Sequence, residues 1–449
     1  MPAEADGNGR RRVVIVGGGF GGLAAAHALR RADVDVTLVD RTNHHLFQPL
    51  LYQLAAGGIS EGECAASIRT ALRHASNTSV LMAEVTDVDP ERRQVVLERG
   101  ERLDYDSLIV ACGARTSYFG HDEWQNVSYG LKTLADAVAL RNRVYGAFEE
   151  AERAADPAER DEWLTFAVVG GGATGVEVSG VLAIIARHRT RRTFGRIDPG
   201  DARVILLDAG DRVVPAFSEK LSAKAGRYLE ELGVTVREGA RATGIDKHGV
   251  TVQIDGASER IPARTVIWAA GVRAASLSET LAKATGVSTD RAGRIEINPD
   301  LTLPGHPEIS AIGDTTTLTG PDDKPLPGLA TVAIQQARHV AKAIHAGQPG
   351  ASTPFRYFDK GALAVVGRGK AVCEVRGLEL AGRPAFFTYL GVHLYYLGGG
   401  VGRRLEVLTD WVTARIGRPQ NQVIEGELES IERRAPAEAA RWEPTSSSR

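Results

Sequence analysis

The chain has 449 residues, of which 43% are hydrophobic and 24% charged, and its formal net charge is −2. A chain of this length holds about three domains with buried cores, and the composition is that of an ordinary globular protein. The small net charge gives no general attraction to nucleic acid, so we expect no nucleic-acid partner. The three cysteines, Cys64, Cys112 and Cys373, are scattered along the chain. They argue against a disulfide framework or a metal site and fit a reducing compartment.

The first predicted element is a buried strand, Val13–Val16, followed by a glycine-rich turn and a helix that begins near Leu23. The turn has the spacing Gly17-x-Gly19-x-x-Gly22. The first glycine allows a tight turn, the second lets a pyrophosphate approach the backbone, and the third lets the helix lie close to the strand. The helix N-terminus then presents unpaired N–H groups and a positive dipole end to the phosphates.

A second predicted strand, residues 34–40, ends in Asp40. Its carboxylate can accept hydrogen bonds from both hydroxyls of an adenosine ribose. A glycine motif alone is often only a turn, but strand, glycines, helix, strand and acid in this order predict a dinucleotide site. Residues 107–114 are a further buried strand ending in a glycine turn, which we expect to return to the same sheet.

The same unit occurs a second time. Residues 163–169 form a predicted strand, and the glycines that follow at the same spacing are Gly170, Gly172 and Gly175. The next strand ends in Asp208, which favours NADH because the 2′-phosphate of NADPH would meet a like charge. Arg212 nearby keeps NADPH from being excluded. Two such units in one chain suggest two dinucleotides, usually a flavin and a nicotinamide.

Two later strands complete the units. Residues 265–272 are a strand followed by glycine and close the second unit. Residues 309–314 are a strand–Gly–Asp element that follows the completed second unit, so we expect it to return to the first sheet. The predicted fold class is therefore α/β, with two Rossmann-like domains, the second inserted in the first, and a C-terminal membrane-associating helical region. The predicted domains are 1–125 with 301–382, 126–300, 383–433, and a disordered tail at 434–449.

Over residues 12–425 the chain resembles the type II NADH dehydrogenases, single-subunit NADH:quinone oxidoreductases that do not pump protons. The matching stretches are Gly17–Gly22, Leu46–Leu51, Gly170–Glu177, Trp268–Val272, Gly313–Asp314, Pro327–Gln336, Phe358–Gly361 and His393–Leu397. The sequences Ala-Thr-Gly-Val-Glu and Trp-Ala-Ala-Gly-Val within them are more specific than the Rossmann motifs. The absence of a cysteine pair argues against a flavoprotein disulfide reductase.

The resemblance implies FAD in the first unit, NADH in the second and a quinone at the membrane face. The expected FAD-binding residues are Gly17, Gly19, Phe20, Gly21, Gly22, Asp40, Arg41, Gln48, Val85, Ala111, Gly113, Gly313, Asp314, Ala330, Thr331 and Lys360. The expected NADH-binding residues are Gly170, Gly172, Ala173, Thr174, Gly175, Glu177, Asp208, Ala270 and Gly271. Glu177 and Gln335 are implied to be catalytic, and Thr331 and Gln335 to contact the quinone.

Two of these residues have alternative interpretations. Glu177 could be an acid in the first turn of a helix that complements the helix dipole, whereas the resemblance implies a proton relay near the nicotinamide and flavin. The family's quinone helix contains Ala-Gln-x-Ala-x-Gln, and in this chain Thr331 replaces its first glutamine while Gln335 keeps the second. Because threonine is shorter, we expect weaker quinone binding.

Residues 384–402 carry no formal charge. His393, three tyrosines and the break at Gly398–Gly400 leave too few apolar residues for a transmembrane helix. A second predicted helix has an apolar face of Leu405, Leu408, Trp411, Val412 and Ile416, flanked by Arg403, Arg404, Arg415 and Arg418. Residues 383–418 are therefore predicted to lie in the membrane interface, with a dimer contact or a domain cover as the alternative.

The resemblance, together with these patterns, implies a peripheral enzyme on the cytoplasmic side of the cell membrane that passes electrons from NADH through FAD to menaquinone or ubiquinone. Residues 1–12 are polar, so no secretory signal is expected there, and a homodimer is expected. Two alternatives stay open: a soluble NADH-dependent flavoprotein reductase of a non-quinone acceptor, and a flavin redox sensor with slow turnover.

Overall fold

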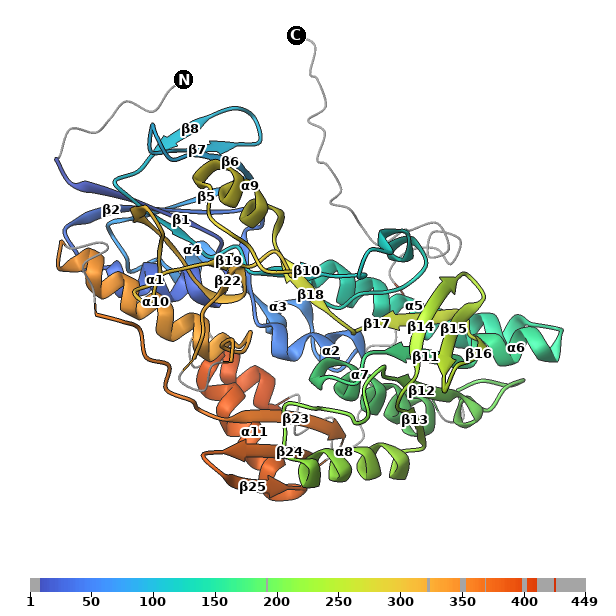
Figure 1. The fold of residues 1–449 in the computed structure, drawn as a ribbon. Helices are drawn as coiled ribbons and strands as arrows, with labels where there is room; N and C mark the ends of the chain where they lie inside the picture. Colours follow the sequence, from blue (N-terminus) through green and yellow to red (C-terminus); the bar gives the residue numbers. More distant parts are fainter. Residues whose placement is uncertain are drawn as a thin grey trace, which may run out of the picture. The chain divides into compact units, whose positions relative to one another are not determined.

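The computed structural model describes residues 9–190, 193–320, 324–347, 353–367, 369–397, 402–409 and 424, with the backbone alone at residues 188 and 189. By its internal contacts the chain divides into two compact units. Unit 1 contains Met1–Leu46, Ala65–Arg115 and Val272–Lys360. Unit 2 contains Phe47–Cys64, Thr116–Gly271 and Gly361–Arg449. Each unit has its own sheet, mainly parallel in unit 1 and fully parallel in unit 2, with helices packed on it (Figure 1).

The centre of unit 1 is a six-stranded sheet in the order β20-β21-β9-β1-β2-β5. Its strands are β1 (Arg11–Val16), β2 (Val34–Asp40), β5 (Thr78–Met82), β9 (Ser107–Val110), β20 (Thr302–Leu303) and β21 (His306–Ala311). All neighbours run parallel except β20 and β21. The predicted return of residues 107–114 and 309–314 to the first sheet is confirmed, because β9 pairs with β1 and β21 pairs with β9.

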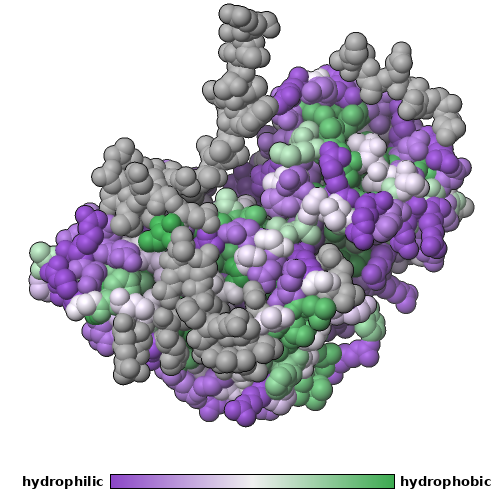
Figure 2. All heavy atoms as spheres, turned by 180° about the vertical axis from the view of Figure 1, so that it is seen from behind, coloured by the Kyte–Doolittle hydropathy of each residue, from purple (hydrophilic) through white to green (hydrophobic). Residues whose placement is uncertain are grey.

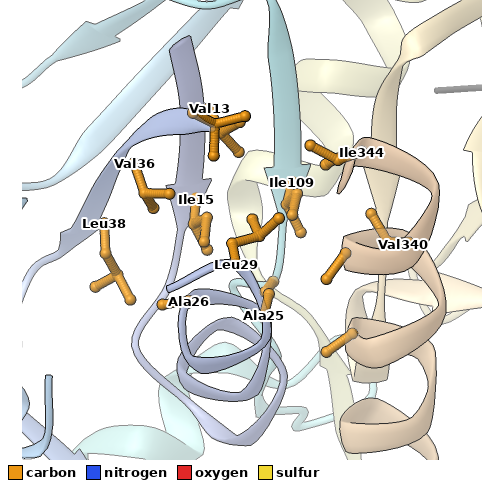
Figure 3. Close-up of a cluster of buried hydrophobic side chains, with 14 of the residues drawn as sticks. Val13, Ile15, Ala25, Ala26, Leu29, Val36, Leu38, Ile109, Val340 and Ile344 are labelled. Atoms are coloured by element: carbon orange, nitrogen blue, oxygen red, sulfur yellow. The ribbon is translucent and has the colours of Figure 1, made fainter. Parts of the chain in front are cut away.

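Two helices cover one face of this sheet. The helices α1 (Phe20–Leu29) and α10 (Ala330–His345) lie side by side although they are far apart in sequence (Figure 1). Leu29, Ile109 and Val340 point into one apolar core between the sheet and the two helices (Figure 3). Burial of each large aliphatic side chain there contributes about 1.5–3 kcal/mol to the free energy of folding. This packing fixes the strand ends from which the glycine turn and the Gly313–Asp314 turn emerge.

A second core covers the opposite face of the sheet. It includes the antiparallel strands β6 (Val85–Asp89), β7 (Gln94–Leu97) and β8 (Arg102–Asp104), and the helix α9 (Ser276–Thr285). The shorter elements of this unit are β3 (His44–Leu46), β4 (Ala65–Ser67), α4 (Ile68–Ala71), β10 (Ala114–Thr116), β18 (Val272–Ala274), β19 (Ile295–Glu296), η5 (Gly313–Thr315) and β22 (Thr316–Thr317).

Unit 2 is built on a four-stranded parallel sheet in the order β13-β12-β11-β17. Its strands are β11 (Thr165–Val169), β12 (Arg203–Leu207), β13 (Val234–Arg237) and β17 (Thr265–Trp268). The predicted closing strand of the second unit is confirmed, because β17 pairs with β11 in parallel. An antiparallel sheet of β14 (Arg241–Asp246), β15 (Gly249–Ile254) and β16 (Ala257–Pro262) packs into the same core.

Two helices precede this sheet. The helix α5 (Leu134–Arg153) begins with a capping box in which Thr133 and Asp136 each bond the other's backbone N–H. The helix α6 (Pro157–Trp163) follows the N-cap Asp156, and proline is tolerated at its first position because no N–H is needed there.

The helix α7 (Ala173–Ile184) packs against a three-stranded sheet that was not predicted from the sequence. The strands of that sheet are β23 (Ala362–Gly367), β24 (Lys370–Val375) and β25 (Leu378–Ala381). Gly180 of α7 lies so close to β23 that a Cβ atom there would overlap the carbonyl oxygen of Val366. A glycine is therefore required for the close approach of α7 to β23.

The helix α11 (Arg383–Tyr396) packs on the β23–β25 sheet. The remaining helical elements of unit 2 are η1 (Gln48–Leu50), α2 (Leu51–Ala55), α3 (Glu61–Cys64), η2 (Asp122–Asn126), η3 (Ile185–Arg189), η4 (Pro199–Asp201) and α8 (Glu219–Glu231). Among the described residues, none of the helices is long and apolar enough to cross a membrane.

The predicted second C-terminal helix is seen in part, since residues 402–409 are helical. Arg403 was expected to flank its membrane face, and this expectation is wrong. Its side chain is buried, and its guanidinium donates hydrogen bonds to the carbonyl oxygen of Glu63 at 2.6 and 3.1 Å. The predictions for Gly398–Gly400, Trp411, Val412, Arg415, Ile416, Arg418 and the tail 434–449 lie outside the described residues.

The domains predicted from the sequence are defined by cofactor binding, whereas the two units are defined by contacts. Residues 272–300, predicted as part of the NADH domain, belong to unit 1 by their contacts. The cofactor domains themselves stay a prediction.

We expect Gly180→Ala to lower the melting temperature of the FAD-loaded protein, because overpacking at a tight contact costs about 1–3 kcal/mol. The matched control is Gly391→Ala in α11, where a Cβ atom meets nothing within 4 Å. That change should leave the melting temperature equal or higher, since alanine favours a helix over glycine. Equal melting temperatures for the two variants would contradict the tight contact.

Candidate functional site

The glycine turn after β1 has the shape of a phosphate cradle. Gly17 has φ +104°, and a Cβ atom on it would overlap the carbonyl oxygen of Ala111. A Cβ atom on Gly22 would overlap the carbonyl oxygen of Gly17. At Gly19, by contrast, nothing lies within 4 Å of the Cβ position. The turn is closed by the chain's own backbone at its outer glycines and open at its middle glycine, as pyrophosphate binding requires.

Asp40 is fixed at the end of β2. One carboxylate oxygen accepts a hydrogen bond from Gly18 N–H at 2.6 Å, and the other accepts from the N–H and hydroxyl of Thr42, both at 2.7 Å. A carboxylate has about four acceptor positions, so with these three bonds Asp40 keeps one for a hydroxyl of a ribose. The residues present therefore fit the adenosine end of FAD.

A pocket of about 260 Å³ lies in unit 1 beside the Gly313–Asp314 turn. Asp314 lines this pocket, is only partly buried, and makes no hydrogen bond with the described part of the chain. A carboxylate that faces a pocket without a partner suits the hydroxyls of a ribityl chain. Arg273 and Arg294 also line the pocket, where each pairs with an acid of its own segment.

Gln336 holds this turn in place, a role absent from the sequence analysis. Its side-chain oxygen accepts a hydrogen bond from Gly313 N–H at 2.7 Å, and the side chain is buried. Gln336 stands one helical turn from Val332 and from Val340, both buried. This spacing places it on the apolar face of α10, and a polar residue on that face was the available signal.

Gln335 and Thr331 are engaged differently from the prediction. The Gln335 amide nitrogen donates to the carbonyl oxygens of Thr331 and Phe358 at 3.1 and 3.0 Å. Its amide oxygen accepts from Phe358 N–H at 3.0 Å. In this arrangement both amide protons are used within the chain. The Thr331 hydroxyl lies 3.2 Å from the hydroxyl of Tyr357 and does not bond back to its own helix.

The second glycine turn, in unit 2, repeats the first. Gly170 has φ +112°, a Cβ atom on Gly175 would overlap the Gly170 carbonyl oxygen, and Gly172 is open. Asp208 accepts hydrogen bonds from the N–H groups of Gly171 and Gly210, as Asp40 does from Gly18 and Thr42.

Arg212 is turned toward its own segment. It lies 3.5 Å from Glu219 and donates to the Pro215 carbonyl oxygen at 3.3 Å. In this arrangement its charge is directed at an acid of α8.

Glu177 lies in α7 beyond its first turn, which contains no acidic residue. The interpretation of Glu177 as an acid that complements the helix dipole is therefore wrong. One carboxyl oxygen accepts from Val365 N–H at 3.4 Å. Burial raises the pKa of this carboxyl to about 8, and the Val365 bond opposes the shift only in part. Glu177 is thus largely protonated at neutral pH and can both give and take a proton.

The helices α1, α7 and α10 share one property: no side chain caps their N-termini. Their first N–H groups are therefore available to a ligand. Phe20, Gly21 and Gly22 begin α1, Ala173 and Thr174 begin α7, and Ala330 and Thr331 begin α10.

The other predicted site residues differ in how exposed they are and in the unit to which they belong. Arg41, Gln48 and Lys360 are exposed, and Gln48 belongs to unit 2. Val85 is buried in the second core of unit 1, so only its backbone could contact a cofactor. Gly113 N–H donates to the Thr315 hydroxyl at 3.0 Å. Ala270 and Gly271 follow β17 and are partly buried.

Comparison with known proteins agrees with this geometry. The model of the pyridine nucleotide-disulphide oxidoreductase family matches residues 11–337. The type II NADH:quinone oxidoreductase Ndh of Mycobacterium tuberculosis is 44% identical over 422 residues, covering 92% of this chain and 90% of that protein. The type II NADH:quinone oxidoreductase of Staphylococcus haemolyticus is 30% identical over 401 residues, covering 88% and 97%.

Solved structures show the same fold. NDH2 from Plasmodium falciparum in complex with NADH matches 92% of this chain and 100% of that chain, with a TM-score of 0.84 and 22% identity. The sulfide:quinone oxidoreductase from Aquifex aeolicus matches 89% and 92%, with a TM-score of 0.69 and 16% identity.

Glu177→Gln tests the buried carboxyl through stability. The folded protein holds the Glu177 proton up to about pH 8, whereas an ordinary glutamate loses it near 4.5. As the pH rises between these values, the unfolded chain ionises and the folded chain does not, so folding loses stability. The melting temperature of the unchanged protein should therefore fall relative to Glu177→Gln over this interval and keep a constant offset above it. An offset independent of pH would contradict the raised pKa.

Proposed function

The chain belongs to the type II NADH:quinone oxidoreductases, and we propose that it oxidises NADH held at the second glycine turn and reduces a quinone through FAD held at the first. FAD and NADH are the cofactors of this family. One observation carries the assignment of the two sites. The chain contains two glycine turns that are closed at their outer glycines, open at Gly19 and Gly172, and flanked by Asp40 and Asp208.

FAD, when bound, accepts a hydride from NADH and passes two electrons on. The chain's part is to bind and orient it. We assign the pyrophosphate to the open backbone at Gly19 and the first N–H groups of α1, the adenosine ribose to Asp40, and the ribityl hydroxyls to Asp314. Gln336 fixes Asp314 indirectly, because it holds the preceding Gly313 N–H.

NADH is assigned to Gly172, the N-terminus of α7 and Asp208. The carboxylate of Asp208 accepts the ribose hydroxyls of NADH and repels a 2′-phosphate. Reduction of a quinone takes up one proton from the medium for each NADH oxidised. Glu177 is the group of unit 2 that we assign to this proton, because burial keeps its carboxyl protonated at neutral pH.

We assign quinone contact to Thr331 and a positioning role to Gln335. Gln335 fixes Phe358 through two hydrogen bonds, and this holds the neighbouring Tyr357 beside Thr331. Two hydroxyls then replace the single amide of the family's motif. Each hydroxyl both donates and accepts, so the pair can donate to a quinone carbonyl.

We place the enzyme on the cytoplasmic surface of the cell membrane, as a homodimer. Phe387 and Tyr395 of α11 are 59% and 71% exposed, and Leu405 is 57% exposed. Large exposed apolar side chains suit a membrane interface. One face of the molecule shows apolar residues gathered in patches among polar ones (Figure 2).

Steady-state oxidation of NADH with and without a quinone tests this function against its alternatives. The unchanged protein should oxidise NADH rapidly with a menaquinone or ubiquinone analogue in vesicles. Rapid turnover with a soluble acceptor alone would favour the soluble reductase. Slow turnover with every acceptor would favour the redox sensor.

The assignment of Asp314 predicts a loss of FAD in Asp314→Ala. Its carboxylate offers a charged hydrogen-bond acceptor, worth about 1.5–3 kcal/mol, so the dissociation constant of FAD should rise roughly 10- to 100-fold. Flavin fluorescence during dilution measures it. The control is Asp33→Ala, an exposed acid of the same unit. Unchanged FAD affinity in Asp314→Ala would remove Asp314 from the site.

The assignment of Thr331 predicts that Thr331→Val raises the Michaelis constant for quinone. One neutral hydrogen bond is worth about 0.5–1.5 kcal/mol, so the rise should be roughly two- to tenfold. The rate of flavin reduction by NADH should not change. Thr235→Val, on the exposed face of β13, is the control. A Michaelis constant that stays the same in Thr331→Val would exclude this hydroxyl from quinone binding.

A further inference from the structure

Two buried tyrosines of unit 2 share a hydrogen bond. Tyr52 of α2 and Tyr389 of α11 are 8% and 1% exposed, and their hydroxyl oxygens lie 3.1 Å apart. The Gln53 amide also donates to the Tyr52 hydroxyl at 3.0 Å. The pair thus joins a helix near the start of the chain to α11.

The two hydroxyls and the Gln53 amide are hydrogen-bonded to one another. Two hydroxyls carry two protons, and the bond between them uses one. Gln53 bonds both hydroxyls, and its amide can accept a hydrogen bond as well as donate one. The three side chains thus form one buried hydrogen-bonded group, within which a proton can pass from one hydroxyl to the next.

Glu177 is the acid close to this pair. Burial is the largest cause of the raised pKa of each tyrosine, and the Glu177 carboxylate, when it is ionised, raises both pKa values further. Its helix α7 packs against α2, and its carboxyl is held by Val365 of β23, on which α11 also packs. Tyr52 and Tyr389 lie on the helices packed around Glu177, and the Glu177 charge changes the pKa of both.

His393 is the other titratable group beside Tyr389, and it is excluded as a proton donor. Its ring centroid lies 3.7 Å from that of Tyr389, and its Nδ1 atom lies 2.8 Å from the Tyr389 carbonyl oxygen. A carbonyl only accepts, so Nδ1 carries the proton. Burial lowers the pKa of His393 to about 4, so the imidazole is neutral at neutral pH.

We propose that Tyr52 and Tyr389 relay the proton that Glu177 exchanges during quinone reduction. The proposal rests on the proposed function. The reaction is NADH + H⁺ + quinone → NAD⁺ + quinol: two electrons and one proton leave NADH as hydride, and the medium supplies the second proton. A hydroxyl can accept one proton while it releases another. The pair therefore passes a proton to or from the carboxyl without holding a charge in the interior.

Tyr389→Phe and Tyr52→Phe, in the full-length FAD-loaded protein, test the relay. Each removes one hydroxyl and keeps the ring. Turnover with a quinone analogue should fall about 100-fold or more, because a lost proton-transfer group typically costs 10²- to 10⁴-fold in rate. Its pH profile and its solvent deuterium isotope effect should change as well. Turnover with ferricyanide, which takes electrons without protons, should stay as it is.

The control is Tyr228→Phe in unit 2, whose hydroxyl makes no hydrogen bond with the described residues and whose ring contacts Lys370. It should leave both activities and the pH profile unchanged. Unchanged quinone turnover in both relay variants would overturn the relay, and so would an equal loss with quinone and ferricyanide, which would show a role in folding only. Absence of quinone turnover in the unchanged protein would instead overturn the proposed function.

Discussion

Backbone atoms at the two glycine turns approach more closely than any side chain would allow. Gly22 packs on the carbonyl of Gly17, and Gly175 packs on that of Gly170. This contact brings each helix N-terminus to the end of its strand and leaves the middle glycine open. The parallel sheets hold the two turns, and the acids at the ends of the neighbouring strands complete them. Both cofactor sites depend on this single constraint.

A similar constraint shapes the acid chemistry of unit 2. Gly180 lets α7 lie against β23, and this contact brings Val365 N–H to the Glu177 carboxyl. The carboxyl is thereby buried among groups that carry no charge, and burial raises its pKa to about 8. Gly180, one helical turn from Glu177, thus allows the burial that keeps the Glu177 carboxyl protonated. The raised pKa makes the fold less stable at neutral pH. It also gives a carboxyl that can exchange protons at that pH.

The sequence was sufficient for the elements whose signals are local. Strand, glycine spacing and terminal acid predicted both parallel sheets, and the position of residues 309–314 after the second unit predicted their return to the first. The β23–β25 sheet has no comparable local signal. The roles of Gln335, Gln336 and Arg403 depend on which backbone each side chain meets after folding. Tyr52 and Tyr389 are 337 residues apart, so only the tertiary structure shows that their hydroxyls meet.

The central claim is that electrons pass from NADH to a quinone through one bound flavin. Anaerobic stopped-flow absorbance at the flavin band tests it most directly, because the two half-reactions are observed in sequence. NADH should bleach the flavin within the time of one steady-state turnover, and a menaquinone or ubiquinone analogue should restore it as quickly. A reduced flavin that stays bleached with every quinone, while a soluble acceptor reoxidises it, would contradict the account.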